Sequence, residues 1–133
     1  MKEIKITIAD DHPVFISGLR MLLDGEPSLK IIGEATNGNN ALEQIQKLNP
    51  DVAVLDVNMP DKNAFDIVRA LREQKREINI IFLTMHDEEA MLNAALDLGV
   101  KGYILKDSAM SEIVNAVKSV ANGKNFITPK LST

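Results

Sequence analysis

The chain has no cysteine and no tryptophan, and only one of its 133 residues is tyrosine. The lack of cysteine excludes a disulfide framework and a thiolate metal site, and it fits the reducing cytoplasm. No apolar run approaches the roughly 18 residues of a membrane span. The N-terminal stretch MKEIKITIAD alternates charge with isoleucine and does not form a signal sequence. We therefore expect a cytoplasmic protein with no membrane association.

A surplus of positive charge is also absent. The formal net charge is −4, whereas a nucleic-acid-binding domain needs a basic face to contact phosphates. We therefore expect no nucleic-acid binding by this domain itself. The hydrophobic fraction of 45% is ordinary for a globular protein, and the length is sufficient for a single domain with its own core.

Five short apolar runs are predicted to be strands. Most are rich in isoleucine and valine, which favour a pleated surface. The third run, VAVL, is apolar throughout, as expected for a central strand of a parallel sheet. The predicted strands are Ile4–Ala9, Lys30–Ala35, Val52–Leu55, Asn79–Thr84 and Gly102–Leu105.

A segment of helical periodicity follows each predicted strand. Apolar residues recur three and four positions apart in these segments, which places them on one face of a helix. This alternation predicts an α/β domain with right-handed crossovers and a mostly parallel sheet covered on both faces. The apolar faces span Phe15–Leu23, Leu42–Leu48, Ala64–Leu71, Met91–Leu98 and Ile113–Ala121.

One domain is predicted for residues 1–123, because the connections between the predicted elements are short. The tail KNFITPKLST is polar, contains proline and has no further periodic segment. We interpret residues 124–133 as the start of a linker.

Polar residues follow four of the five predicted strands, and the second strand runs instead into the turn-like stretch EATNGN. In an open parallel sheet, ligands bind outside the carboxyl ends of the strands. The residues found there are Asp10 and Asp11 after the first strand, Asp56 after the third, Thr84 at the end of the fourth and Lys106 after the fifth.

All of these residues except Asp56 also have a simpler interpretation. Asp10 or Asp11 would serve as a helix cap, Thr84 as a strand-end hydroxyl and Lys106 as a solvated charge. Asp56 has no such role, because the nearby Pro60 keeps the chain extended or turned where a capped helix would begin. A single shared site explains all of these residues together.

Three carboxylates at one sheet edge repel, and their pKa values rise unless a cation lies among them. Oxygen ligands favour a hard ion, Mg²⁺ first, with Mn²⁺ or Ca²⁺ able to substitute. A carboxylate, a metal ion, a hydroxyl and a lysine are the groups that hold a transferring phosphoryl group. The predicted nucleophile is Asp56, on the central strand, and the product is an acyl phosphate.

Four stretches, ADDHP, LDVNMP, FLTMH and GYILKDS, closely resemble in order and spacing the receiver domain of bacterial two-component response regulators. Two more, GLRMLL and EATNGNNALE, resemble the NarL/FixJ (LuxR-type) subgroup. The resemblance covers residues 4 to about 123. It implies a CheY-like (flavodoxin-like) doubly wound α/β fold, with five helices and a five-stranded parallel sheet in the order 2-1-3-4-5.

The resemblance also implies a role for each site residue. Asp56 would be the phosphoacceptor and a metal ligand, and the switch residue Thr84 would join Lys106 in stabilising the phosphoryl group. The other implied roles are metal binding for Asp10, Asp11 and the backbone carbonyl of Asn58, the switch aromatic for Tyr103 and the site rim for His86 and Met59. We interpret His86 as a residue that tunes dephosphorylation.

The partners implied by the resemblance are a cognate sensor histidine kinase as phosphodonor, the protein's own output domain and a second copy when phosphorylated. Such a domain is not a turnover enzyme on an external substrate. Its output would be transcription, through a C-terminal helix-turn-helix that does not follow residue 133 in this sequence. We expect truncation to explain that absence; a stand-alone receiver that acts as a phosphate sink or a protein-interaction module is the alternative.

One position departs from the family pattern. Ala64 occupies a position where the family usually has glycine, so we expect a slightly different loop before the third helix.

Two other classes of protein fit these residues less well. A haloacid-dehalogenase-like phosphatase would need a nucleophile after the first strand and an acid in place of Asn58. A flavodoxin-like FMN binder would need a phosphate-cradling first loop, and the acidic stretch DDHP repels phosphate.

Overall fold

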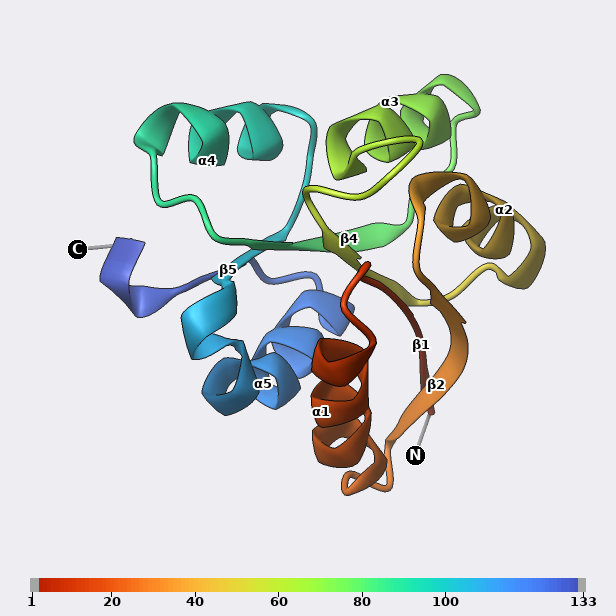
Figure 1. The fold of residues 1–133 in the computed structure, drawn as a ribbon, viewed down its shortest axis with the longest axis vertical. Coiled ribbons are helices and arrows are strands. Elements are labelled where there is room, and N and C mark those ends of the chain that lie inside the picture. The colour runs from red at the N-terminus through yellow and green to blue at the C-terminus, as the bar shows by residue number, and fades with distance from the viewer. Residues whose placement is uncertain (1–2, 132–133) are drawn as a thin grey trace.

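A computed structural model of the chain describes residues 3–131. Strands and helices alternate along the chain (Figure 1). The strands are β1 (Ile4–Ala9), β2 (Leu29–Ala35), β3 (Val52–Asp56), β4 (Asn79–Thr84), β5 (Gly102–Leu105) and β6 (Phe126–Ile127). The helices are α1 (Pro13–Asp24), α2 (Gly38–Leu48), α3 (Ala64–Glu73), α4 (Glu89–Asp97) and α5 (Ala109–Ala121), with short 3₁₀ turns η1 (Lys106–Ser108) and η2 (Pro129–Leu131).

The sheet is parallel throughout, in the order β2-β1-β3-β4-β5-β6. Helices α1 and α5 cover one face, and α2, α3 and α4 cover the other (Figure 1). The predicted α/β architecture, the five helices and the order of the first five strands are confirmed. Strand β3 is buried along its whole length, which agrees with its continuous apolar sequence.

The predicted number of strands is wrong, because the sheet has six strands within residues 3–131 and not five. The sixth strand consists of only Phe126 and Ile127, which pair with Gly102 and Tyr103 of β5. Two residues are too few to show an alternating pattern, and the pairing depends on the exposed edge of β5, far away in the sequence. The interpretation of residues 124–133 as the start of a linker stays a prediction.

The loop between β3 and α3 packs closely on the start of α2. The amide of Gly38 donates a hydrogen bond to the carbonyl of Pro60, 2.9 Å away. A Cβ at Gly38 would lie 2.0 Å from the carbonyl oxygen of Lys62, so only glycine permits this approach. Helix α3 then begins with a capping box, in which Asn63 and Asp66 each bond the backbone of the other.

Ala64 is the first residue of α3, and its side chain is fully buried. Within residues 3–131, the left-handed backbone conformation in this loop is adopted by Asp61, with a φ of 74°, and not by Ala64. The replacement of glycine by alanine therefore requires no strained backbone at this position. Among the described residues, no helix combines the length and the apolar character needed to cross a membrane.

Candidate functional site

The polar residues predicted from the strand ends meet at one edge of the sheet. Asp10 and Asp11 follow β1, Asp56 ends β3, Thr84 ends β4, and Lys106 follows β5 directly. Strand β3 lies between β1 and β4 in the sheet. Asp56 is therefore placed between the acid pair on one side and Thr84 on the other, at the edge where ligands of open parallel sheets bind.

The acidic residues form a compact group. Ligand atoms of Asp10, Asp11, His12 and Asp56 all lie within 4.8 Å of one another. Asp10 is fully buried, and only 4% of Asp56 is exposed. Asp10 Oδ2 and Asp11 Oδ1 are buried without a hydrogen bond of acceptable geometry. Their close neighbours are the Lys106 ammonium and the His12 ring, and carboxylate oxygens that converge in this way fit the donor set of a hard divalent cation.

His12 is the member of this group that the sequence reasoning did not assign to the site. Its amide donates a hydrogen bond to Asp10 Oδ1, 2.8 Å away, and its ring Nδ1 lies 3.0 Å from the same oxygen. Nδ1 also lies 3.1 Å from Asp11 Oδ1. The run Asp-Asp-His was the available signal, but the turn that folds the imidazole back over the acid pair is not visible in the sequence.

Lys106 supplies the positive charge of the group. Its ammonium nitrogen lies 2.8 Å from Asp10 Oδ2 and donates to Asp56 Oδ2, 3.2 Å away. Burial lowers the pKa of Lys106, but the hydrogen bond to Asp10 and the charge of Asp56 outweigh it and raise that pKa above its usual value. Lys106 therefore stays protonated and offsets part of the negative charge.

The carboxyl of Asp56 has a strongly perturbed pKa. Burial is the largest cause, followed by repulsion from Asp10, while Lys106 acts in the opposite direction. Together these effects raise the pKa of Asp56 from 3.8 to about 6. A buried carboxylate with a raised pKa and a charged partner in a site of this kind is a candidate for a chemical role.

Thr84 and Tyr103 are both bonded to the backbone of His86. The amide of His86 donates to Thr84 Oγ1, 3.0 Å away, and the Tyr103 hydroxyl donates to the carbonyl of His86, 3.1 Å away. Tyr103 is fully buried, and burial raises the pKa of its hydroxyl. Thr84 Oγ1 also lies 3.9 Å from Met91 Sδ, on α4. The two predicted switch residues are thus joined through one loop residue.

The side chains of Asn58 and His86 meet across the site. Asn58 Nδ2 lies 3.3 Å from His86 Nε2, which connects the β3–α3 loop to the β4–α4 loop. The amide of Asn58 also donates to Asp56 Oδ1, 3.3 Å away. Met59 is partly buried and packs against the core cluster under α2, α3 and α4, and its place at the rim stays a prediction. Sequence reasoning placed Asn58 and His86 at the site but did not predict their contact.

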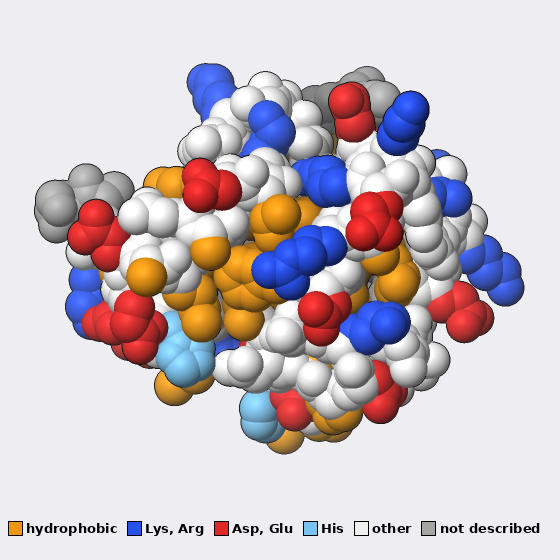
Figure 2. Space-filling view, turned by 90° about the horizontal axis from the view of Figure 1, so that it is seen from above, with side chains coloured by type: hydrophobic (Ala, Val, Ile, Leu, Met, Phe, Trp, Pro, Cys, Tyr) orange, Lys and Arg blue, Asp and Glu red, His pale blue; other side chains and the backbone are white. Residues whose placement is uncertain are grey.

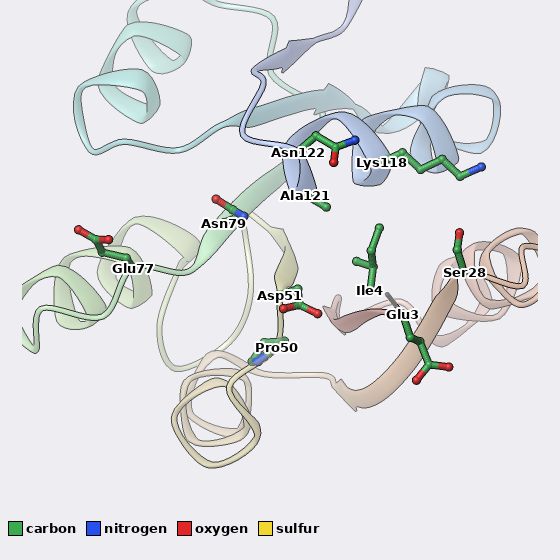
Figure 3. A pocket seen from close by; sticks show the side chains of 10 residues that line it. All are labelled: Glu3, Ile4, Ser28, Pro50, Asp51, Glu77, Asn79, Lys118, Ala121 and Asn122. Carbon is green, nitrogen blue, oxygen red and sulfur yellow. The ribbon is translucent and has the colours of Figure 1, made fainter. Parts of the chain in front are cut away.

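Of two larger hollows in the surface, one lies away from the predicted site residues and the other is bordered by His86. A cavity of about 670 Å³ opens at the amino ends of the strands, among Ile4, Asp51 and Asn79, and none of the predicted site residues lines it (Figure 3). On the face formed by α2, α3 and α4, hydrophobic side chains gather in the middle, with charged ones around them (Figure 2). A groove there lies between Phe65 of α3 and Met91 of α4.

The family model of the response regulator receiver domain matches residues 6–118. The chain belongs to the response regulator receiver family. It is 35% identical to the transcriptional regulatory protein DegU of Brevibacillus brevis, over 98% of this chain and 55% of DegU. It is 36% identical to the probable transcriptional regulatory protein NarL of Mycobacterium tuberculosis, over 98% of this chain and 60% of NarL.

Solved receiver domains have the same fold as this receiver. The signal receiver domain of the putative response regulator NarL from Mycobacterium tuberculosis superimposes with a TM-score of 0.88 at 36% identity, covering 93% of this chain and all of the other. The non-phosphorylated receiver domain of RcsB from Escherichia coli gives 0.88 at 29% identity, over 95% and 98% of the two chains. The domain is therefore a CheY-like receiver of the NarL/LuxR type and not a metabolic enzyme. It spans little more than half the length of its relatives DegU and NarL.

Proposed function

We propose that this receiver accepts a phosphoryl group on Asp56 from a phosphohistidine of a sensor histidine kinase. The observation that carries the proposal is the convergence of the buried Asp56 with Asp10, Asp11 and Lys106 at one sheet edge. A carboxylate oxygen of Asp56 would attack phosphorus while the bond from phosphorus to the donor's imidazole nitrogen breaks. The electron pair of that bond leaves with the imidazole, which then takes up a proton.

Different residues of the chain would bind the metal ion and the phosphoryl oxygens. Asp10, Asp11, Asp56 and the backbone carbonyl of Asn58 would hold Mg²⁺, which neutralises charge on the phosphoryl oxygens; Mn²⁺ or Ca²⁺ would substitute. Lys106 would turn its ammonium from the carboxylates to one phosphoryl oxygen. Thr84 would donate its hydroxyl to another, giving up its contacts with His86 and Met91.

This exchange of contacts provides a switch. Phosphorylation adds a charge of roughly −1.5 to −2 and three strong acceptors. Two or three charge-assisted hydrogen bonds of roughly 1.5 to 3 kcal/mol each match the roughly 5.5 kcal/mol needed to invert a conformational equilibrium from 1:99 to 99:1. Movement of Thr84 would also shift the backbone of His86, to which the buried Tyr103 is hydrogen-bonded, so Tyr103 would be displaced and the face formed by α4, β5 and α5 would change with it.

The altered face would act on partners. A second phosphorylated copy and the protein's own output domain are the partners that we propose, in the cytoplasm, with transcription as the output. Relatives named as transcriptional regulators support this, as does an RcsB structure solved as a complex with DNA. The second candidate is a receiver that acts alone as a phosphate sink, and the relatives' greater length favours the first.

The test is incubation of the chain with Mg²⁺ and acetyl phosphate, followed by intact-mass measurement. One added phosphoryl group is expected, lost with EDTA and lost in Asp56→Asn. Asp97→Asn, at the exposed end of α4, is the matched control and should be phosphorylated like the unchanged chain. Phosphorylation of Asp56→Asn to the same extent would contradict the assignment of the acceptor.

A further inference from the structure

Residues 126–131 follow the outer edge of β5, where the chain continues beyond α5 (Figure 1). The amide of Phe126 donates to the carbonyl of Lys101, 2.8 Å away, and the amide of Thr128 donates to the carbonyl of Tyr103, 2.9 Å away. Leu131 packs against the same core cluster as Tyr103. The segment is thus hydrogen-bonded to β5 beside Tyr103, the aromatic residue that moves in the proposed switch.

Thr128 is the most constrained residue of this segment. Only 1% of it is exposed. Its hydroxyl accepts a hydrogen bond from the amide of Leu105, 3.0 Å away, and donates one to Glu112 Oε1, 2.9 Å away. Leu105 directly precedes Lys106, and Glu112 belongs to α5. A single buried hydroxyl therefore joins the segment to the backbone that carries Lys106 and to α5.

The same segment also approaches the site directly. A small cavity of about 70 Å³ is lined by Thr84, Lys106 and Lys130 together. Thr84 and Lys106 are the two residues whose contacts change when Asp56 is phosphorylated in the proposed function. Ile127, which precedes Thr128, thus pairs with Tyr103, and Lys130, which follows it, lines a cavity with Thr84 and Lys106. These are the residues that move in the proposed switch.

We propose that Thr128 is a positioning residue for Lys106, and that residues 126–131 leave the edge of β5 when Asp56 is phosphorylated. The inference rests on the proposed function and adds a regulated segment to it. When Lys106 moves its ammonium from Asp10 to a phosphoryl oxygen, the adjoining peptide shifts, and the Leu105 amide moves away from the Thr128 hydroxyl. The coupling is reciprocal, so loosening the segment also favours phosphorylation.

Hydrogen exchange of the whole chain tests the release. The chain is incubated with Mg²⁺ and acetyl phosphate, and intact-mass measurement of the same sample gives the phosphorylated fraction. The amides of Phe126 and Thr128 should exchange faster by about tenfold in the phosphorylated chain, a shift within the range of measured coupling free energies. The amide of Val54, in the centre of the sheet, should exchange as before.

Two variants and a control test the positioning role. Thr128→Val keeps the shape and removes both side-chain hydrogen bonds, so it should give fast exchange of residues 126–131 without acetyl phosphate. It should also speed phosphorylation at limiting acetyl phosphate by about tenfold, because the variant raises the fraction of chains in which the segment is already released. Thr128→Ser keeps the hydroxyl and should behave like the unchanged chain. Ile45→Val, which weakens the distant core under α2, should lower the Tm without changing the phosphorylation rate.

The outcomes separate this inference from the proposed function. Unchanged exchange at Phe126 and Thr128 in a chain that the mass shows to be phosphorylated would overturn the release, while the proposed function stands. A Thr128→Val variant that loses stability but keeps the unchanged phosphorylation rate would reduce Thr128 to a structural role. No phosphorylation of the unchanged chain would overturn the proposed function, and this inference with it.

Discussion

The hydroxyl of Tyr103 and the hydroxyl of Thr84 are both bonded to the backbone of His86, through its carbonyl and its amide respectively. Neither side chain can therefore leave its position without a change in the β4–α4 loop. Since Thr84 ends β4 and Tyr103 lies in the neighbouring β5, this loop residue links the end of β4 to β5.

Tyr103→Ala should leave phosphorylation of Asp56 intact and abolish phosphorylation-dependent association, because the aromatic group that reports the movement of Thr84 is gone. Tyr103→Phe keeps the ring and removes only the hydrogen bond to His86. It should associate at least as readily as the unchanged chain. Light scattering of phosphorylated samples measures association; equal association in Tyr103→Ala would rule the coupling out.

The raised pKa of Asp56 predicts a pH-dependent stability for the metal-free chain. The folded-state pKa of about 6 lies above the unfolded value of 3.8, so the fold favours the protonated carboxyl. The corresponding stability is present below pH 3.8 and is lost as pH rises to about 6. At pH 7.5, Asp56→Asn should raise the free energy of unfolding by on the order of 3 kcal/mol.

Denaturant unfolding of both chains across this pH range, with EDTA present, measures the effect. The difference between Asp56→Asn and the unchanged chain should grow from pH 4 to pH 6 and then level off. Added Mg²⁺ should shrink it, because a bound ion stabilises only the chain that carries the full ligand set. A difference that is constant with pH would show that Asp56 is not perturbed in the folded state.

Lys106→Met should destabilise the metal-free chain at neutral pH, because Asp10 and Asp56 would remain buried without their cation. Removal of one partner from a buried ion pair costs about 3 kcal/mol or more. Mg²⁺ should restore more stability to Lys106→Met than to the unchanged chain, since the added ion replaces the lost charge. Lys47→Met, on the exposed side of α2, is the control and should unfold at nearly the unchanged denaturant concentration.

The contact between Asn58 and His86 predicts an effect on the lifetime of the phosphoryl group. His86→Ala removes the side chain that lies 3.3 Å from Asn58 Nδ2 and opens the site to water. Dephosphorylation should be faster by about fivefold, which corresponds to one hydrogen bond of about 1 kcal/mol. Decay of the phosphorylated mass after removal of acetyl phosphate gives the rate, and a slower decay would contradict a shielding role.

The sequence predicts most of this fold because its signals are local. Strands β1, β4 and β5 have the predicted bounds, and β3 extends one residue further, to Asp56. Helix α2 begins at Gly38, four residues before the predicted apolar face begins at Leu42, because Asn37 caps it by accepting a hydrogen bond from the amide of Asn40. The cap depends on side-chain geometry, which hydrophobic periodicity does not report.

The sequence predicts the convergence of the site residues for a different reason. In a parallel sheet every strand ends at the same edge, so Asp10, Asp56 and Lys106 come together once the topology is known. The contact between Asn58 and His86 and the two bonds of Thr128 depend instead on how separate loops pack. Such long-range contacts leave no periodic signal, and this is also why β6 was not predicted.

The burial of β3 on both faces, and its pairing with β1 and β4, has a mechanical consequence. Asp56, the proposed phosphoacceptor, is held on a strand that is paired on both sides, and we expect phosphorylation to displace that strand little. The loops after the strands and the edge segment 126–131, whose strand β6 is paired on one side only, would take up the displacement instead. Unequal stiffness, with a rigid centre and more loosely held margins, would then amplify the signal in this receiver.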